Sequence, residues 1–441
     1  MTDRPTDRPA PDADAAKAPA DTNASQKPDP HADRARMDWE GWVVIGRKPD
    51  PHADRVQAAH KLPADTCDAL RELVGRIAKV RALVVGDGIG DCYHEIAIDR
   101  ENPEAPGSHV YNFVRSTTRP GGASAVAAMV GAIQGPDSPR LIEAIGTHRP
   151  LKTRFGTGYL PVAGQVYRRE PPQCVMRQDR PLFLTEKLAN TGGALHKLTE
   201  KGITGTGWAP KLGDDPRPPD VIILSDYAQG VVEQPVLDHL RDYLRSQLAQ
   251  ALADGRDPAI ALPIVIIDPR RAELIDQALV DQYRRLADFD DSESRTGMGG
   301  PWLWMTPNRS ETQKLLELNP GSWGQRGSWG HLPTMLCTDG ENPVRTIVDW
   351  ETDTMFLPIR QFRPIDPCGC GDQFAATFGL ALAAIRQSRS KCGATCLLPR
   401  RSVKLAIQLA QLAAGLQTQR IGATPIRAAE LLDEIDRVEE D

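Results

Sequence analysis

The stretch IDPCGCGDQF, residues 365–374, combines glycines, cysteines and a carboxylate, residue types that can take part in group transfer or metal binding. A run of Phe, Ala, Leu and Ile without proline follows Asp372, which predicts a buried helix beginning here. The first N–H groups of a helix have no partner within it, and the helix dipole adds partial positive charge. Gly369, Cys370 and Gly371 would therefore offer backbone N–H groups to an anion such as phosphate.

Asp372 shares this helix start, and its charge bears on the kind of site. A carboxylate would repel a phosphate that is merely held. It fits better if it accepts a proton from an attacking hydroxyl while the N–H groups hold a phosphoryl group in transfer. Because Asp is also common at N-caps and in first turns, Gly-x-Gly-Asp alone is a weak motif, and a structural Asp372 is the alternative.

The cysteines of this stretch also allow a metal site. Cys368 and Cys370 could join Cys392 and Cys396, but structural zinc usually takes two close pairs such as Cys-x-x-Cys. Free buried thiols are the favoured interpretation.

Short apolar runs rich in β-branched residues recur along the chain, and each is followed at once by a small or acidic polar residue. Such runs are typical of parallel strands buried on both faces. Ligands bind beyond the carboxyl ends of such strands. The residues at those ends are Asp87, Asp226, Asp268, Asn308 and Thr338.

Helical patterns lie between several of these runs, at residues 234–252 and 270–287. The alternation predicts a doubly wound α/β fold with a mostly parallel sheet and helices on both faces. Order is expected to begin near Leu62, and apolar residues at helical spacing within 64–81 predict an earlier helix with Thr66 or Asp65 as its N-cap. Residues near 92–119 and 151–170 alternate polar and apolar side chains, which predicts antiparallel strands forming a small β lid that excludes water.

Residues 1–60 form a segment rich in Pro, Asp, Ala and Lys, which predicts a disordered tail before one domain at 61–441. The octapeptide KPDPHADR occurs at Lys27–Arg34 and again at Lys48–Arg55. We interpret it as a duplicated piece of linker. The alternatives are a tandem docking motif or weak metal sites at His31 and His52.

Composition excludes several classes of protein. The 441 residues carry a net charge of −6 with 5% aromatics and no basic run, so no nucleic-acid partner is expected. No segment reaches the length of a membrane span, and no membrane partner is expected. Scattered cysteines and the absence of a secretory signal predict a reduced, cytoplasmic protein.

A set of motifs in fixed order resembles the ribokinase-type (PfkB) carbohydrate kinases, and among them the kinases of D-glycero-D-manno-heptose 7-phosphate. The set covers residues 81–432 and comprises VVGDGIGDCY, NPEAPGSHV, RPGGASAVA, LSDYAQG, IIDPR, TPNRSE, DPCGCGD and AAGLQTQRIGATP. Each motif is weak alone, whereas their order is specific. The resemblance implies a ribokinase-like fold and the kinase part only, since no His-x-Gly-His of a fused nucleotidyltransferase is present.

The resemblance also implies roles. Asp372 would be the general base, with Gly369, Cys370 and Gly371 as the anion hole. The residues implied to hold the sugar or its phosphate are Asp91, Gly121, Gly122, Lys152 and Arg154. Asn308 and Glu311 would organise Mg²⁺ through water, and Thr338 and Gly340 would line the nucleotide pocket.

Structural alternatives exist for these residues. Asp91 could be a turn residue, the two glycines a tight bend, and the basic pair at 152 and 154 a solvated strand face. Asn308 could cap the next helix, alone or in addition to a role with the metal.

The chain departs from the family at several positions. A sugar-contacting Asn is replaced by Ala125, two lysines by Gln229 and Arg270, and a glycine of the nucleotide turn by Pro343. Cysteines 368 and 370 replace Thr and Ala, and insertions occur at 288–300 and 321–333. Phosphoryl transfer is therefore better supported than heptose as the acceptor.

The resulting hypothesis is an ATP-dependent carbohydrate kinase with a sugar or sugar-phosphate acceptor, heptose 7-phosphate O1 among the candidates. Its expected cofactors are Mg²⁺ and the co-substrate ATP, with a monovalent cation left open, and a homodimer is expected by analogy. The alternatives are a non-catalytic sugar-binding protein on the same fold and a kinase for another alcohol such as a nucleoside.

Overall fold

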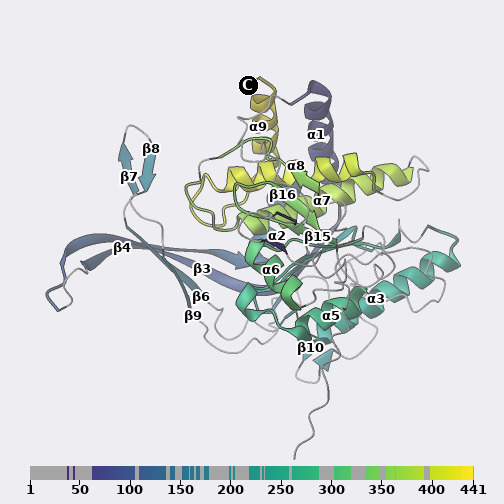
Figure 1. The fold of residues 1–441 in the computed structure, drawn as a ribbon, viewed down its shortest axis with the longest axis horizontal. Helices are drawn as coiled ribbons and strands as arrows, with labels where there is room; N and C mark the ends of the chain where they lie inside the picture. Colours follow the sequence, from purple (N-terminus) through teal and green to yellow (C-terminus); the bar gives the residue numbers. More distant parts are fainter. Residues whose placement is uncertain are drawn as a thin grey trace, which may run out of the picture. The chain divides into compact units, whose positions relative to one another are not determined.

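Figure 1 shows the computed structural model of the chain. It describes residues 62–104, 109–135, 140–144, 151–157, 159–162, 165–168, 173–177, 218–228, 231–232, 234–257, 261–287, 302–318, 334–347, 354–362, 364–391 and 398–440, and four short strands at 37–38, 43–44, 198–199 and 202–203.

The chain divides into two compact units, Met1–Ala53 and Asp54–Asp441. In the first unit, β1 (Met37–Asp38) pairs antiparallel with β2 (Val43–Val44). The rest of the predicted tail, with both copies of KPDPHADR, lies outside the described residues.

The central sheet of the second unit contains the strands that the apolar runs predicted, together with one parallel strand at residues 140–144 and two antiparallel strands that they did not predict. In spatial order the parallel strands are β5 (Arg140–Ala144), β3 (Ala82–Glu101), β12 (Val221–Ser225), β13 (Ile264–Asp268), β14 (Leu303–Met305) and β15 (Thr334–Cys337). Antiparallel β16 (Val344–Ile347) and β17 (Thr354–Phe356) complete one edge. Every residue of β12 is buried, as expected for a strand covered on both faces. The predicted α/β fold with a mostly parallel sheet is confirmed.

The register brings the carboxyl ends of these strands together. Ser225 at the end of β12 pairs with Asp268 on one side and with Gly86 on the other. Farther along, Asn308 and Thr338 form a parallel bridge. The polar residues that follow the strands therefore lie along one edge of the sheet.

Helices lie on both faces of the sheet (Figure 1). One group comprises α1 (Ala64–Ile77), α2 (Ala123–Gln134), α7 (Cys370–Lys391), α8 (Arg400–Gln417) and α9 (Ala428–Glu440). On the other face lie α3 (Gln234–Ala253), α5 (Gln277–Ala287) and α6 (Arg309–Leu318). No described helix combines the length and apolar character needed to cross a membrane.

Two helix boundaries differ from the prediction. The N-cap of α1 is Pro63 rather than Asp65 or Thr66, because the Pro63 carbonyl already accepts the first helical hydrogen bonds. The pattern at 270–287 divides into a short 3₁₀ turn at Ala272–Leu274 and α5. The division follows from Asp276, whose carboxylate accepts a hydrogen bond from the Leu279 N–H at 2.9 Å and so caps α5.

The lid segments form a second sheet continuous with the first. Strand β3 does not end at Asp87; its second half pairs antiparallel with β4 (His109–Gly122), as predicted for 92–119. The same half pairs with β6 (Leu151–Thr157), but in parallel, so the antiparallel prediction is wrong for this strand pair. On its other side β6 pairs antiparallel with β9 (Gln173–Arg177). Strands β7 (Tyr159–Val162) and β8 (Gln165–Arg168) pair antiparallel with each other in a separate two-stranded sheet.

Helix α7 approaches the sheet closely at a glycine. A Cβ added to Gly379 would lie 2.9 Å from the Ile266 side chain on β13 and 3.1 Å from that of Val221 on β12. The absence of a side chain therefore sets the depth at which α7 packs and, with it, the place of the first turn of α7.

We expect Gly379→Leu to push α7 away from the sheet and to lower the free energy of unfolding by about 1–3 kcal/mol, as overpacked cores do. Gly75→Ala is the matched control, because a Cβ at Gly75 on α1 meets no atom within 4 Å. That change should raise stability by about 0.5–1 kcal/mol through helix propensity. Urea unfolding measures both, and equal effects of the two changes would contradict the packing argument.

Candidate active site

The loop before α7 is held by a buried hydrogen-bond network. The Asp366 carboxylate accepts hydrogen bonds from the N–H groups of Cys368 at 3.0 Å and Gly422 at 2.9 Å. The Gln417 amide donates to the carbonyl oxygens of the same two residues at 2.7 and 2.6 Å. These four hydrogen bonds tie the loop to the segment around Gly422, although the buried Gln417 Oε1 has no partner of its own.

Gly369 and Gly371 differ in the space that a side chain would have at each position. Gly369 has φ +81°, and a Cβ there would lie 2.7 Å from the Ala423 Cβ, so only glycine fits. At Gly371 a Cβ would meet nothing within 4 Å, so there is open space beside the helix start. The Cys370 N–H donates to the Pro367 carbonyl at 3.3 Å, so one of the three expected anion-hole donors is engaged in a turn. The anion-hole assignment stays a prediction.

Asp372 lies in the first turn of α7 and is 6% exposed. Its two carboxylate oxygens accept the hydroxyl of Tyr227 at 3.1 and 3.2 Å. Burial, and then the nearby Asp372, raise the pKa of Tyr227 well above its usual value, so the phenol stays protonated and can donate. Tyr227 belongs to the LSDYAQG motif, whose site role the sequence reasoning missed.

The turn that carries Tyr227 is anchored by buried Asp87. The two Asp87 carboxylate oxygens accept the N–H groups of Tyr227 at 2.8 Å and Val231 at 3.0 Å. Next along the turn, Asp226 accepts the Ala228 N–H at 2.8 Å. Asp87, inside β3, and Asp226, just after β12, are therefore structural residues that hold the turn carrying Tyr227.

Asp226 also forms a buried ion pair. It accepts the Arg270 Nε at 2.8 Å and the Tyr283 hydroxyl at 3.1 Å. Burial raises the pKa of Asp226, and Arg270 opposes that shift. Arg270, which replaces a lysine of the family motif, thus has a structural partner here.

The residues expected to hold a sugar lie beside the α7 loop. Asp91 on β3 is 4% exposed, and the Cys368 thiol donates to its carboxylate at 3.9 Å. A Cβ at Gly121 would lie 3.0 Å from the Asp91 Cγ, so glycine leaves that carboxylate room. Gly122 has φ +56° and would place a Cβ 2.3 Å from the Asp87 carbonyl oxygen, which is a structural reason for this glycine.

The basic pair on β6 is placed only by register. Lys152 pairs with Asp91, and Arg154 pairs with Tyr93. Their side chains lie outside the described part of the chain, so their assignment to a substrate phosphate stays a prediction.

Asn308 and Glu311 form a reciprocal cap at the start of α6. The Glu311 carboxylate accepts the N–H of Asn308 at 2.8 Å and its side-chain amide at 2.6 Å, while the Asn308 Oδ1 accepts the Glu311 N–H at 3.0 Å. Burial raises the pKa of Glu311 to about 7, against the hydrogen bonds from Asn308. The capping alternative is therefore realised, and a metal role would be additional to it.

The predicted nucleotide residues lie next to this cap. The Thr338 N–H donates to the Pro307 carbonyl at 2.9 Å, which joins the end of β15 to the residue before Asn308. Gly340 is exposed with φ +59° and has open space around its Cβ position. The structure thus brings Asn308, Glu311 and Thr338 together, with Gly340 in the turn that follows.

Asp268 interacts electrostatically with both Asp372 on α7 and Glu311 on α6. Burial raises its pKa well above the usual value, and the carboxylates of Asp372, Glu311 and Asp226 raise it further. A divalent cation would relieve this repulsion, and oxygen ligands suit Mg²⁺. The described residues contain no group of three or more His, Cys, Asp or Glu side chains that could hold a metal ion.

Two further residues that sequence reasoning missed support the loop. The Arg119 guanidinium donates to the Ile421 carbonyl at 2.7 Å and to the Thr424 hydroxyl, and the Tyr93 hydroxyl donates to the Cys368 thiol at 3.2 Å. Arg119 stands in the quoted RPGG motif, which was the available signal. Cys392 and Cys396, the other half of the suggested metal site, lie outside the described residues.

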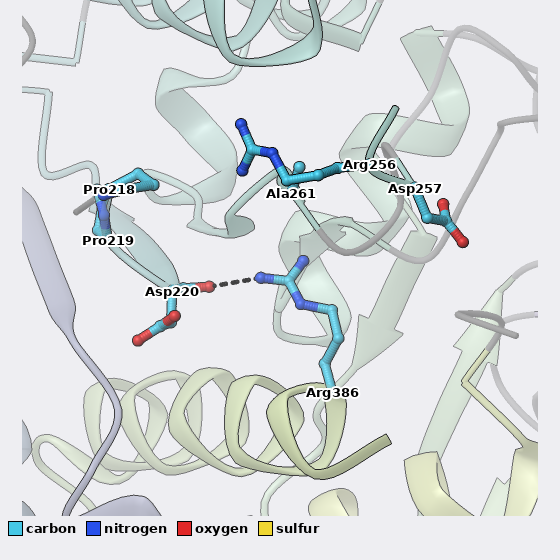
Figure 2. Close-up of a pocket in the computed structure, with 7 residues that line it drawn as sticks. All are labelled: Pro218, Pro219, Asp220, Arg256, Asp257, Ala261 and Arg386. Atoms are coloured by element: carbon cyan, nitrogen blue, oxygen red, sulfur yellow. Dashed lines mark hydrogen bonds between the residues drawn. The ribbon is translucent and has the colours of Figure 1, made fainter. Parts of the chain in front are cut away.

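A cavity of about 290 Å³ lies at the opposite, amino end of β12 (Figure 2). It is lined by Pro218, Pro219, Asp220, Arg256, Asp257, Ala261 and Arg386. Arg386 donates to the Asp220 carbonyl at 3.0 Å. Because Asp220 precedes β12 whereas Tyr227 follows it, this cavity is separate from the candidate active site.

Comparison with known proteins gives distant relatives. No family model matches the chain. The bifunctional protein HldE of Caulobacter sp. (strain K31) is 28% identical over 373 residues, covering 83% of this chain and 64% of that protein, and HldE of Rhodospirillum rubrum is 24% identical over 402 residues, covering 85% and 66%. Among solved structures, ribokinase from Thermotoga maritima has a TM-score of 0.46 and 14% identity, covering 82% of this chain and 99% of its own.

The chain spans slightly less than two thirds of the length of these HldE proteins. The relationship agrees with the ordered motifs, which run through the same domain. The chain is a distant homologue of the HldE proteins, in agreement with the resemblance of its ordered motifs to the ribokinase-type (PfkB) carbohydrate kinases.

Proposed function

We propose that the chain is an ATP-dependent carbohydrate kinase that transfers the γ-phosphoryl group to a sugar or sugar-phosphate hydroxyl. The observation that carries this proposal is the buried Asp372 carboxylate in the first turn of α7, beside Gly371 with its open space and close to the loop that contacts Asp91. A carboxylate at a helix N-terminus serves proton abstraction next to a held phosphate better than it serves phosphate binding alone.

In the proposed step, Asp372 accepts the proton of the acceptor hydroxyl. The acceptor oxygen forms a bond to the γ-phosphorus, and the bond between that phosphorus and the bridging oxygen of the β-phosphate breaks, so ADP leaves with the electron pair. The first N–H groups of α7 stabilise the charge on the transferring group.

Magnesium fits the acidic side of the site. Asn308 and Glu311 would hold it through water. The Asp268 carboxylate interacts electrostatically with Glu311 and would also interact with the bound ion. When bound, Mg²⁺ supplies positive charge that neutralises the nucleotide phosphates. The local residues would orient its waters, while the α6 cap keeps both side chains in place.

Heptose 7-phosphate is the proposed acceptor on the strength of the motif order and the HldE relatives. The departures concern the sugar side: Ala125 is buried on α2 in the hydrophobic core, so it offers no polar contact to a sugar. Asp91 and Gly121 are the residues that we assign to the acceptor. The homodimer and the monovalent cation stay predictions.

We expect Asp372→Asn to lower kcat about 10²–10⁴-fold, the usual contribution of a general base. Asn keeps the shape of Asp and can still accept the Tyr227 hydroxyl, so calorimetry should show unchanged MgATP binding. Asp254→Asn, at an exposed carboxylate bonded to Arg256, is the control and should leave kcat unchanged. Full transfer by Asp372→Asn would rule out this mechanism.

Asn308 can be tested with a substitution that keeps the cap. Ser is as good an N-cap as Asn, so Asn308→Ser should unfold with nearly the wild-type free energy, whereas Asn308→Ala should lose about 1 kcal/mol. If Asn308 also serves the metal, both changes raise the KM for MgATP about 10-fold, the value of one hydrogen bond to a charged group. A wild-type KM in Asn308→Ser would show that Asn308 is a cap only.

An acceptor panel in a coupled ADP-release assay tests the substrate. We expect heptose 7-phosphate to give the highest kcat/KM among heptose, ribose and fructose phosphates and nucleosides. Turnover of another acceptor alone would remove the heptose assignment. Sugar binding by calorimetry, without turnover and without MgATP affinity, would instead establish the non-catalytic binding protein.

A further inference from the structure

The contact between Tyr227 and Asp372 has a geometry suited to holding a base. A single phenol O–H lies at nearly equal distance, 3.1 and 3.2 Å, from the two carboxylate oxygens. A donor placed between two acceptors fixes the rotation of the carboxylate. It also favours the ionised form, because a hydrogen bond to the charged state stabilises that state.

Carboxylates on both sides hold the backbone at Tyr227 and Ala228, which keeps the Tyr227 ring directed at Asp372. The Tyr227 N–H is held by buried Asp87 at 2.8 Å. The next residue, Ala228, has φ +57°, which is uncommon for a residue other than glycine. Such a conformation persists only where its surroundings impose it, and it often marks a functional site. At this turn the Asp226 carboxylate accepts the Ala228 N–H at 2.8 Å.

The groups that face this pair are acidic or weakly acidic. Asp91 from β3, Asp268 from β13, Cys368 from the loop and Asp372 itself raise the pKa of the Tyr227 phenol after burial has done so. Cys370, on α7, has a pKa raised to about 11 by burial and then by Asp372, so it is a neutral thiol. After burial and Asp372, the charge of Glu311 on α6 further raises the pKa of Asp268. The Tyr227 phenol is therefore a neutral hydrogen-bond donor among carboxylates.

From this geometry we propose that Tyr227 is the positioning residue of the base: its hydroxyl aims the Asp372 carboxylate and keeps it ionised until the acceptor hydroxyl arrives. The inference rests on the proposed function, because it gives Asp372 the role of general base. Tyr227 itself exchanges no proton with the acceptor, since it stays protonated throughout.

The test is the pH dependence of kcat/KM in Tyr227→Phe, which keeps the ring and removes the donor. Loss of one hydrogen bond to a charged group should lower the plateau value about 10-fold. The acid limb should also move to higher pH, because the carboxylate without its donor takes up a proton more readily and the base is lost earlier as pH falls. A structural role would lower activity equally at every pH.

Tyr283→Phe is the matched control, because it removes another buried phenol that donates to a carboxylate, Asp226, without contacting Asp372. It should lower the unfolding temperature and leave the acid limb in place. If Tyr227→Phe does not fold, a fluorinated tyrosine at position 227 decides the question. Its more acidic hydroxyl is a stronger donor and should move the acid limb to lower pH.

The outcomes separate the two claims. Transfer by the wild-type protein with an unmoved acid limb in both Tyr227 variants would overturn the positioning role and leave the kinase proposal standing. No transfer by the wild-type protein to any acceptor would overturn the kinase proposal, and the role of Tyr227 with it. An acid limb that moves to higher pH in Tyr227→Phe and to lower pH with the fluorinated tyrosine supports both the positioning role and the kinase proposal.

Discussion

The packing depth of α7 on β12 and β13 is the constraint on which the candidate site depends. Gly379 allows the helix to approach the sheet, and the Asp366 and Gln417 hydrogen bonds hold the loop that precedes it. Together they determine where the first turn of α7 meets the carboxyl ends of the strands. The start of the helix, which we propose as the anion hole, and the Asp372 carboxylate therefore lie at the edge where α/β sheets bind ligands.

Electrostatic repulsion is the second organising feature. Carboxylates from two strand ends, Asp226 and Asp268, and from helices α6 and α7 converge there. Burial, and then the other three carboxylates, raise the pKa of Asp268. Three sets of donors compensate these carboxylates. Arg270 pairs with Asp226 at the back of the site, and the Tyr227 hydroxyl donates to Asp372. Glu311 accepts hydrogen bonds from its own helix cap. The remaining negative charge suits a bound cation that accompanies a nucleotide.

Much of the fold could be predicted from local patterns. Continuous apolar runs at 221–224 and 264–267 indicated buried parallel strands, and the apolar run after Asp372 indicated the helix that carries this residue. The Tyr227–Asp372 contact could not be predicted, because the two residues are 145 positions apart and no periodicity links them. The continuity of β3 through Asp87 was also hidden, since a polar residue after an apolar run usually marks a strand end. Here its buried carboxylate is satisfied by the turn at Tyr227.

The most direct measurement is a crystal structure of the protein with MgADP, aluminium fluoride and an acceptor sugar, where the fluoride complex mimics the phosphoryl group in transfer. We predict that this group lies against the N–H groups at the start of α7, with the acceptor hydroxyl within hydrogen-bond distance of Asp372 and Mg²⁺ on the side of Asn308 and Glu311. A nucleotide bound elsewhere, or an acceptor hydroxyl out of reach of Asp372, would contradict the assignment of this helix start as the site of transfer.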